Sequence, residues 1–168
     1  MSYALNAAML DGGYGTLDHA AMALMKDAID AITLDADHIL VTCPRGTRFE
    51  GRPGTPAANA ADVIINRFPL GIPKPVPAAG FRGRAVLSNY LTPTGSKIYS
   101  PDCLPLQMPV TAHFEKGRIT RFEGPAGMVA DVEAHYDRVA SAFGLDGYNI
   151  DSWHAGIHPL MAYDMTAE

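Results

Sequence analysis

Two histidines near the end of the chain are the side chains best suited by type and spacing to metal chemistry. His154 and His158 flank Gly156 and precede Pro159, and a glycine-containing loop after a strand is a common place for a binding site. Histidine is the commonest side-chain ligand of transition metals. In an extended strand the two would be about 13 Å apart, so both can bind one ion only if the chain bends at Gly156. We take both as candidate metal ligands.

The spacing of these histidines resembles the helical His-Glu-x-x-His zinc motif only superficially. Position 155 is Ala, so the glutamate that serves as general base in that motif is missing, and the nearby Gly and Pro disfavour a helix. Asp151, Trp153 and Asp164 are candidate groups for orienting the ligands or contacting a substrate. In the alternative interpretation, Asp151 caps the end of a strand and Asp164 is an exposed charge near the C-terminus.

The other histidines fit positions without a chemical role. His19 and His135 fall on the polar faces of predicted helices, so we expect both to be exposed to solvent. His38 begins a predicted strand and His113 lies inside a predicted hairpin, which favours a structural role for each.

The elements that must position these residues indicate an α+β fold. Apolar residues at helical spacing predict helices over 17–33 and 126–143, the first following the candidate N-cap Thr16. Lys116-Gly117 is a typical two-residue hairpin connection. We expect a single domain over 1–168, with a mixed, largely antiparallel sheet and both helices packed on it. The predicted strands are 38–43, a short one within 45–52, 85–91, 110–115, 118–123 and 148–153.

Two further expectations concern surfaces. The apolar stripe of the first helix, which should face the core, consists of Leu17, Ala21, Leu24, Ala28 and Ile32. The proline-rich stretch over 66–80 is predicted to be an extended surface segment, because its four prolines disfavour a helix and a central strand.

Composition and charge exclude several classes of protein. The 168 residues contain 13 Lys and Arg against 18 Asp and Glu, for a net charge of −5, with no basic cluster in the sequence. A nucleic-acid partner is therefore not expected. No apolar run approaches the ~20 residues of a membrane span, and no basic region precedes an apolar one at the N-terminus. Cys43 and Cys103 are expected to be buried thiols in a reducing compartment, so the predicted location is the cytoplasm.

Short motifs in a fixed order give the chain a resemblance to a known family. They are Val-Thr-Cys-Pro-Arg-Gly-Thr at 41–47, Arg-Phe-Pro-Leu-Gly at 67–71, Pro-Val at 109–110 with Phe-Glu-Lys-Gly-Arg-Ile at 114–119, and Ser-Trp-His-Ala-Gly-Ile-His-Pro at 152–159. In this order they resemble the second domain of the thermophilic-type metallo-aminopeptidases (aminopeptidase T, leucyl aminopeptidase). They are also similar to the related 2,5-dihydroxypyridine 5,6-dioxygenases, and the resemblance covers nearly the whole chain.

What the resemblance implies is a metal site. The peptidases hold two divalent ions that activate water for amide hydrolysis, and the dioxygenases hold one Fe(II) that binds the dihydroxypyridine and oxygen. The peptidases usually carry Glu at the position that matches His154, and a histidine there favours an iron-type or otherwise nitrogen-rich site. Members of the family are longer, with a separate N-terminal domain and further ligands downstream. The chain is therefore expected to be a fragment, a truncated gene product or a stand-alone remnant of the family.

Three functions remain open. The first is a metal-dependent hydrolase in which zinc, cobalt or Fe(II) lowers the pKa of a bound water, with His154 as a ligand and His158 as a second ligand or substrate contact. The second is an Fe(II) ring-cleaving dioxygenase acting on a dihydroxylated aromatic. The third is a non-catalytic domain that dimerises or binds a partner. A small-molecule or peptide substrate, no membrane partner and a homo-oligomer are expected, the last because large apolar surfaces seldom remain exposed.

Overall fold

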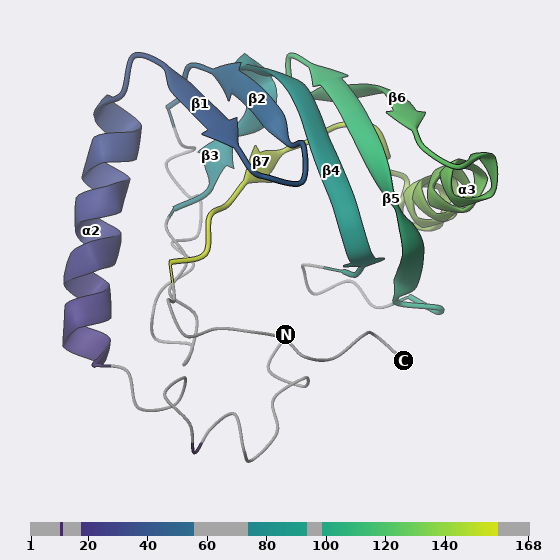
Figure 1. The fold of residues 1–168 in the computed structure, drawn as a ribbon, viewed down its shortest axis with the longest axis horizontal. Coiled ribbons are helices and arrows are strands. Elements are labelled where there is room, and N and C mark those ends of the chain that lie inside the picture. The colour runs from purple at the N-terminus through teal and green to yellow at the C-terminus, as the bar shows by residue number, and fades with distance from the viewer. Residues whose placement is uncertain (1–10, 12–17, 56–73, 94–98, 158–168) are drawn as a thin grey trace.

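The computed structural model describes residue 11 and residues 18–55, 74–93 and 99–157. These residues form a five-stranded antiparallel sheet in the order β1-β2-β4-β5-β6 (Figure 1). The strands are β1 (Ile39–Thr42), β2 (Arg48–Gly51), β4 (Phe81–Leu91), β5 (Leu104–Glu115) and β6 (Arg118–Glu123). This sheet, together with helices α2 (His19–Asp35) and α3 (Ala126–Phe143), confirms the predicted α+β fold class.

The hairpin predicted from Lys116-Gly117 is confirmed. Glu115 of β5 pairs with Arg118 of β6, which leaves a two-residue connection. Both connecting residues have positive φ, 51° at Lys116 and 71° at Gly117. Two-residue hairpin turns with positive φ at both positions match the twist of the flanking strands.

One face of the sheet is covered by two elements. Helix α3 (Ala126–Phe143) packs against β5 and β6, where Val110, Phe122 and Val132 belong to one buried apolar cluster. The helix has the predicted bounds and ends at Gly144, which takes the left-handed conformation at φ 62°. The small antiparallel pair β3 (Val76–Pro77) and β7 (Ser152–Trp153) contributes to a second buried cluster on the same face.

The opposite face of the sheet is exposed to solvent, and side chains alternate between the two faces along each strand. In β5 the even-numbered Val110, Ala112 and Phe114 are buried, whereas His113 is only partly buried and Glu115 is exposed. An antiparallel sheet with one covered face and one solvated face shows this pattern. The charged side chains of the central strands therefore gather on one surface.

Helix α2 (His19–Asp35) differs from prediction in its start and in its buried side. Asp18 is the N-cap, accepting the N–H groups of Ala20 and Ala21 at 2.8 and 3.1 Å, while Thr16 lies outside the described residues. Its buried residues are Met22, Lys26 and Asp30.

The predicted apolar stripe of this helix is wrong, because Leu24 and Ile32 are 73% and 72% exposed. The buried side is set instead by an ion pair of 2.7 Å between Lys26 and Asp30. Asp30 also accepts the N–H of Lys74 at 2.6 Å, which ties α2 to the segment just before β3. The helix stands beside the β1 end of the sheet, whereas α3 packs on its face (Figure 1).

Three other local predictions need correction. Of the segment 66–80, only 74–80 is described, and there Val76 and Ala78 are buried rather than on the surface. The 3₁₀ turn Ala78–Gly80 then leads into β4, which begins at Phe81 instead of 85. The last strand, expected over 148–153, is limited to Ser152–Trp153.

Strand β5 begins at 104, before its predicted start, despite two prolines. Pro105 and Pro109 lie in the half of β5 that extends beyond β6, whose pairing starts at Thr111. That side of the strand is a sheet edge, where a missing N–H leaves no neighbour unsatisfied.

Neither cysteine is fully buried, contrary to expectation. Cys43 is exposed in the turn between β1 and β2, and Cys103 is partly buried. The N–H of Arg45 donates to Cys43 Sγ at 3.3 Å and lowers the pKa of this thiol, while burial raises the pKa of Cys103. Of the helices in the described ranges, none is long and apolar enough to cross a bilayer.

Candidate functional site

The predicted metal ligands fall only partly within the described residues. His154 directly follows β7 and is exposed, with Nε2 lying 3.5 Å from Ser152 Oγ. Asp151 is also exposed. His158 and Asp164 lie outside the described residues. Within the ranges that the structure describes, no group of three or more His, Cys, Asp or Glu side chains is arranged to hold a metal ion, so these residues alone supply no complete donor set.

Trp153, a candidate substrate contact, lies in the apolar cluster that joins β7 to the large sheet. Its ring meets Phe49 and Phe81 edge-on, with centroids 5.5 and 5.6 Å away. Its indole Nε1 is buried and has no hydrogen-bond partner among the described residues. Trp153 therefore has a packing role, and its contacts hold the end of β7 in place directly before His154.

His135 is buried, which corrects the expectation of a solvated histidine on α3. The residue is 7% exposed, and its ring lies 5.8 Å from that of Tyr99. Its Nδ1 is 3.1 Å from a guanidinium nitrogen of Arg138, which also donates to the carbonyls of Ser100 and Pro101. The loop before β5 thus folds over this part of α3, an arrangement that helical periodicity cannot reveal.

The burial of His135 predicts a pH-dependent stability. Desolvation and the neighbouring Arg138 hold the pKa of His135 below its usual value, so the folded protein keeps the imidazole neutral while the unfolded chain takes up a proton near pH ~6.5. The free energy of unfolding should therefore fall as the pH is lowered from about 7.5 to about 5.5. Urea unfolding at both pH values should show a smaller fall for His135→Gln than for wild type. An equal fall in the two proteins, with His38→Gln as the exposed control, would refute this role.

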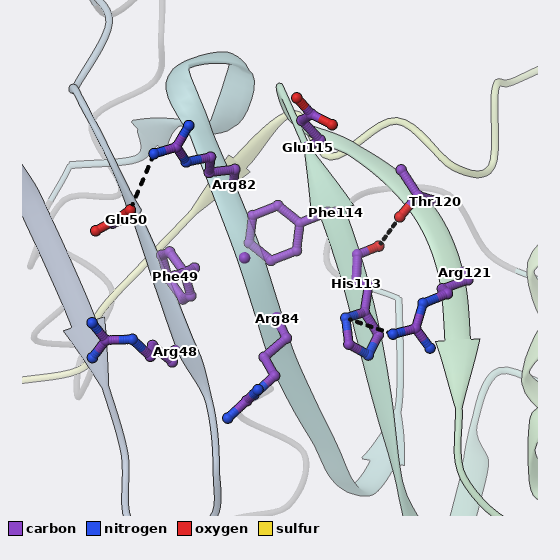
Figure 2. Close-up of a pocket in the computed structure, with 11 residues that line it drawn as sticks. Arg48, Phe49, Glu50, Arg82, Arg84, His113, Phe114, Glu115, Thr120 and Arg121 are labelled. Carbon is purple, nitrogen blue, oxygen red and sulfur yellow. Dashed lines mark hydrogen bonds and ion pairs between the residues drawn. The ribbon is translucent and has the colours of Figure 1, made fainter.

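A row of basic side chains crosses four neighbouring strands on the open face of the sheet. The register pairs Arg48 of β2 with Arg84 of β4, Arg84 with His113 of β5, and His113 with Arg121 of β6. Facing Cβ atoms in such pairs are about 5 Å apart. We call these four residues the arginine row, and Figure 2 shows them across the sheet.

The adjacent row follows the ordinary rule of charge alternation. Glu50, Arg82, Glu115 and Arg118 are register partners in that order across the same strands. Arg82 pairs with Glu50 at 3.3 Å, and Arg118 pairs with Asp146. Cross-strand pairs of opposite charge stabilise a sheet, so this second row needs no ligand to balance it.

At its β6 end the arginine row is already balanced by a carboxylate. Glu123 lies 2.9 Å from His113 Nε2 and 2.7 Å from a guanidinium nitrogen of Arg121. Arg121 and His113 together lower the pKa of Glu123, which therefore stays ionised. Arg121 also approaches His113 Nδ1 at 3.4 Å (Figure 2). The positive charge of Arg121 is thus largely neutralised by Glu123.

At the β2 end the row is not balanced. Arg84 donates from Nε to the carbonyl of Gly46 at 3.1 Å, and no carboxylate among the described residues pairs with either Arg84 or Arg48. Like charges directly opposite each other destabilise a sheet. Sequence features that weaken the fold are expected mainly at functional sites, so this pair is a candidate binding site.

Both ends of the row line an open groove of about 570 Å³. Its lining contains four arginines, and Glu50 and Glu115 are the glutamates that oppose them. The groove therefore has an excess of positive charge in a chain whose net charge is −5. Its volume is within the range of small-molecule sites, and its charge suits an anionic ligand.

The arginine row was not predicted from the sequence. Its members come from four strands, and only the register brings Arg48, Arg84 and Arg121 into one line. A weak local signal exists in Arg82-Gly83-Arg84, where two arginines at alternate strand positions point to one face.

Comparison with known proteins gives no match to a family, to a curated protein or to a solved structure. The fold and site thus define an α+β protein with an arginine-lined sheet face.

Proposed function

We propose that this protein binds an acidic small molecule on the open face of its five-stranded sheet. The observation that supports this most strongly is the direct pairing of Arg48 with Arg84, without a carboxylate partner for either among the described residues. An anion between two guanidinium groups removes their mutual repulsion and gains charge-assisted hydrogen bonds. The groove beside them has room for the rest of the ligand.

The first test is binding of simple anions by the whole chain at low ionic strength. Phosphate, sulfate, citrate and acetate are titrated separately while the melting temperature is followed. A ligand at one hundred times its Kd adds about 2.7 kcal/mol to the stability of the folded state, which raises Tm by several degrees. We expect at least one of these anions to do so, and added NaCl to weaken the effect.

The variants that locate this site remove charge at two places. Arg48→Ala combined with Arg84→Ala should abolish the rise in Tm. Arg52→Ala is the matched control, because Arg52 lies outside the groove and is paired with Asp37 at 2.7 Å. A rise in Tm that is the same in all three proteins would show that the anions act elsewhere.

A metal-dependent enzyme is the second candidate, with hydrolysis or Fe(II)-dependent ring cleavage as its reaction. It is supported by the resemblance in sequence and by the position of His154, whose exposed imidazole has no acidic partner among the described residues. Since those residues form no complete donor set, a site at His154 needs ligands from other parts of the chain, where His158 and Asp164 lie.

Elemental analysis of the purified chain tests this second candidate. If the proposal is right, zinc, cobalt or iron binds in stoichiometric amount and is lost in His154→Ala but not in His38→Ala. Iron would favour oxygen chemistry, and zinc or cobalt would favour hydrolysis. Failure to bind any of the three ions after incubation would reject both metal-dependent functions.

A further inference from the structure

Arg48 and Arg84 are brought together by two separate features of the fold. They are register partners on adjacent antiparallel strands, with side chains on the same face. In addition, Arg84 is anchored by its Nε to the carbonyl of Gly46, two residues before Arg48. Figure 2 shows Arg84 leaning from β4 toward β2. The anchor therefore holds the guanidinium of Arg84 on the side of the sheet where Arg48 begins its strand.

The hydrogen-bonding capacity left at this pair is large. A guanidinium group has five N–H donors. Arg84 uses one of them on Gly46, and no acceptor for Arg48 occurs among the described residues. Arg84 is held in place by this hydrogen bond, and Arg48 lies beside it on the next strand. Two neighbouring positive charges with most of their donors available suit a ligand group with more than one negative charge and more than two oxygens.

From this we infer, on the basis of the proposed anion-binding function, that the group held between Arg48 and Arg84 is a phosphoryl dianion, as in an organic phosphate monoester. A carboxylate has two oxygens and a single charge, and one guanidinium group satisfies it in a bidentate pair. It would leave the second arginine unbalanced. A phosphate monoester has three terminal oxygens and a charge of about −1.5 to −2 at neutral pH, which matches both arginines.

The rest of the ligand extends over the middle of the sheet. The groove continues from the two arginines past Gly83 to His113 and Arg121. Because Glu123 already balances Arg121, this end of the groove favours a neutral or weakly polar moiety. The inferred ligand is thus a small phosphate monoester with its phosphoryl group at the β2 end.

Three probes with the same aromatic group separate charge from shape. Phenyl phosphate, phenyl sulfate and benzoate are titrated into the whole chain by calorimetry, near pH 7.5 and at low salt. Phenyl sulfate has three terminal oxygens but one charge, and benzoate has two oxygens and one charge. We expect phenyl phosphate to bind about tenfold or more tightly than either of the others, a difference well within calorimetric resolution.

Substitutions at the two arginines test the location. Arg48→Gln and Arg84→Gln should each weaken phenyl phosphate binding about tenfold and reduce its advantage over benzoate, while Arg52→Gln keeps both. Arg48→Gln should also unfold at the same or a higher urea concentration than wild type, because it removes a like-charge pair. Loss of binding in a variant that remains folded then reports on the site.

These experiments distinguish failure of the phosphoryl inference from failure of anion binding itself. If phenyl phosphate and benzoate bind equally well and both depend on Arg48, the phosphoryl inference is wrong and the anion-binding function stands. If no probe and no simple anion binds, the proposed function itself is wrong. A greater loss of binding in Arg121→Gln than in Arg48→Gln would overturn the placement of the phosphoryl group.

Discussion

Phe81→Ala is expected to lower the free energy of unfolding by about 3–5 kcal/mol, the usual cost of removing a fully buried phenyl group. Phe81 is 1% exposed at the start of β4. Its ring contacts those of Phe49 at 6.0 Å and Trp153 at 5.6 Å. The substitution would therefore open a cavity where the small β3–β7 sheet meets the large one.

Tryptophan fluorescence during urea unfolding measures this effect. Trp153 is the only tryptophan of the chain and lies in the affected cluster, so its emission reports the packing directly. The control is Met108→Ala, at a side chain that is 54% exposed, where we expect a change within about 0.5 kcal/mol. Similar losses in the two variants would mean that the cluster around Phe81 does not hold the two sheets together.

The parts of the fold that the sequence predicts well are those specified by neighbouring residues. The connection at Lys116-Gly117 has positive φ at both positions and pairs Glu115 with Arg118. Beyond this turn the register shifts by one residue between Phe114 and His113, which the local pattern does not predict. The second helix has a continuous apolar stripe and ends at Gly144. Each of these signals lies within about 20 residues of chain, so no distant contact is needed to interpret it.

The parts that were predicted poorly depend on contacts between distant residues. The buried side of α2 is set by Lys26 and Asp30, and Asp30 bonds to the backbone of Lys74. Hydrophobic periodicity alone places charged residues on the solvent side, so it selects the wrong face here. His135 was misplaced for the same reason, because its partner Tyr99 comes from a loop before β5.

The candidate site shows the same limit. His154 and His158 form a local sequence motif four positions apart, and metal binding there remains a prediction. The arginine row depends on strand pairings that join Arg48 to Arg84 across 36 positions of sequence. A one-residue shift in any of these pairings would move the row members beyond it to the covered face, so the local sequence pattern cannot reveal the row.

Gly83→Ala should be among the most damaging single changes to both the fold and the anion site. Gly83 has φ +140°, which L-residues rarely adopt, and an added Cβ would lie 2.5 Å from the carbonyl oxygen of Arg48 and 2.6 Å from the Cα of Phe49. Both atoms belong to the backbone of β2, so relief requires β2 and β4 to separate. We expect a loss of about 3 kcal/mol or more in the free energy of unfolding.

The same separation would disturb the pairing of Arg48 with Arg84, since these residues flank the contact. Gly83→Ala should therefore also weaken anion binding under conditions in which the variant remains folded.

Gly127→Ala is the matched control, because a Cβ there meets nothing within 4 Å and alanine favours the first turn of α3. This variant should be neutral or slightly stabilising. Urea unfolding of the three proteins, followed by anion titration below the transition, checks both effects. If Gly83→Ala were as stable as wild type and bound anions normally, β2 and β4 would not be held as closely as the structure places them, and the arginine row would lose its geometric basis.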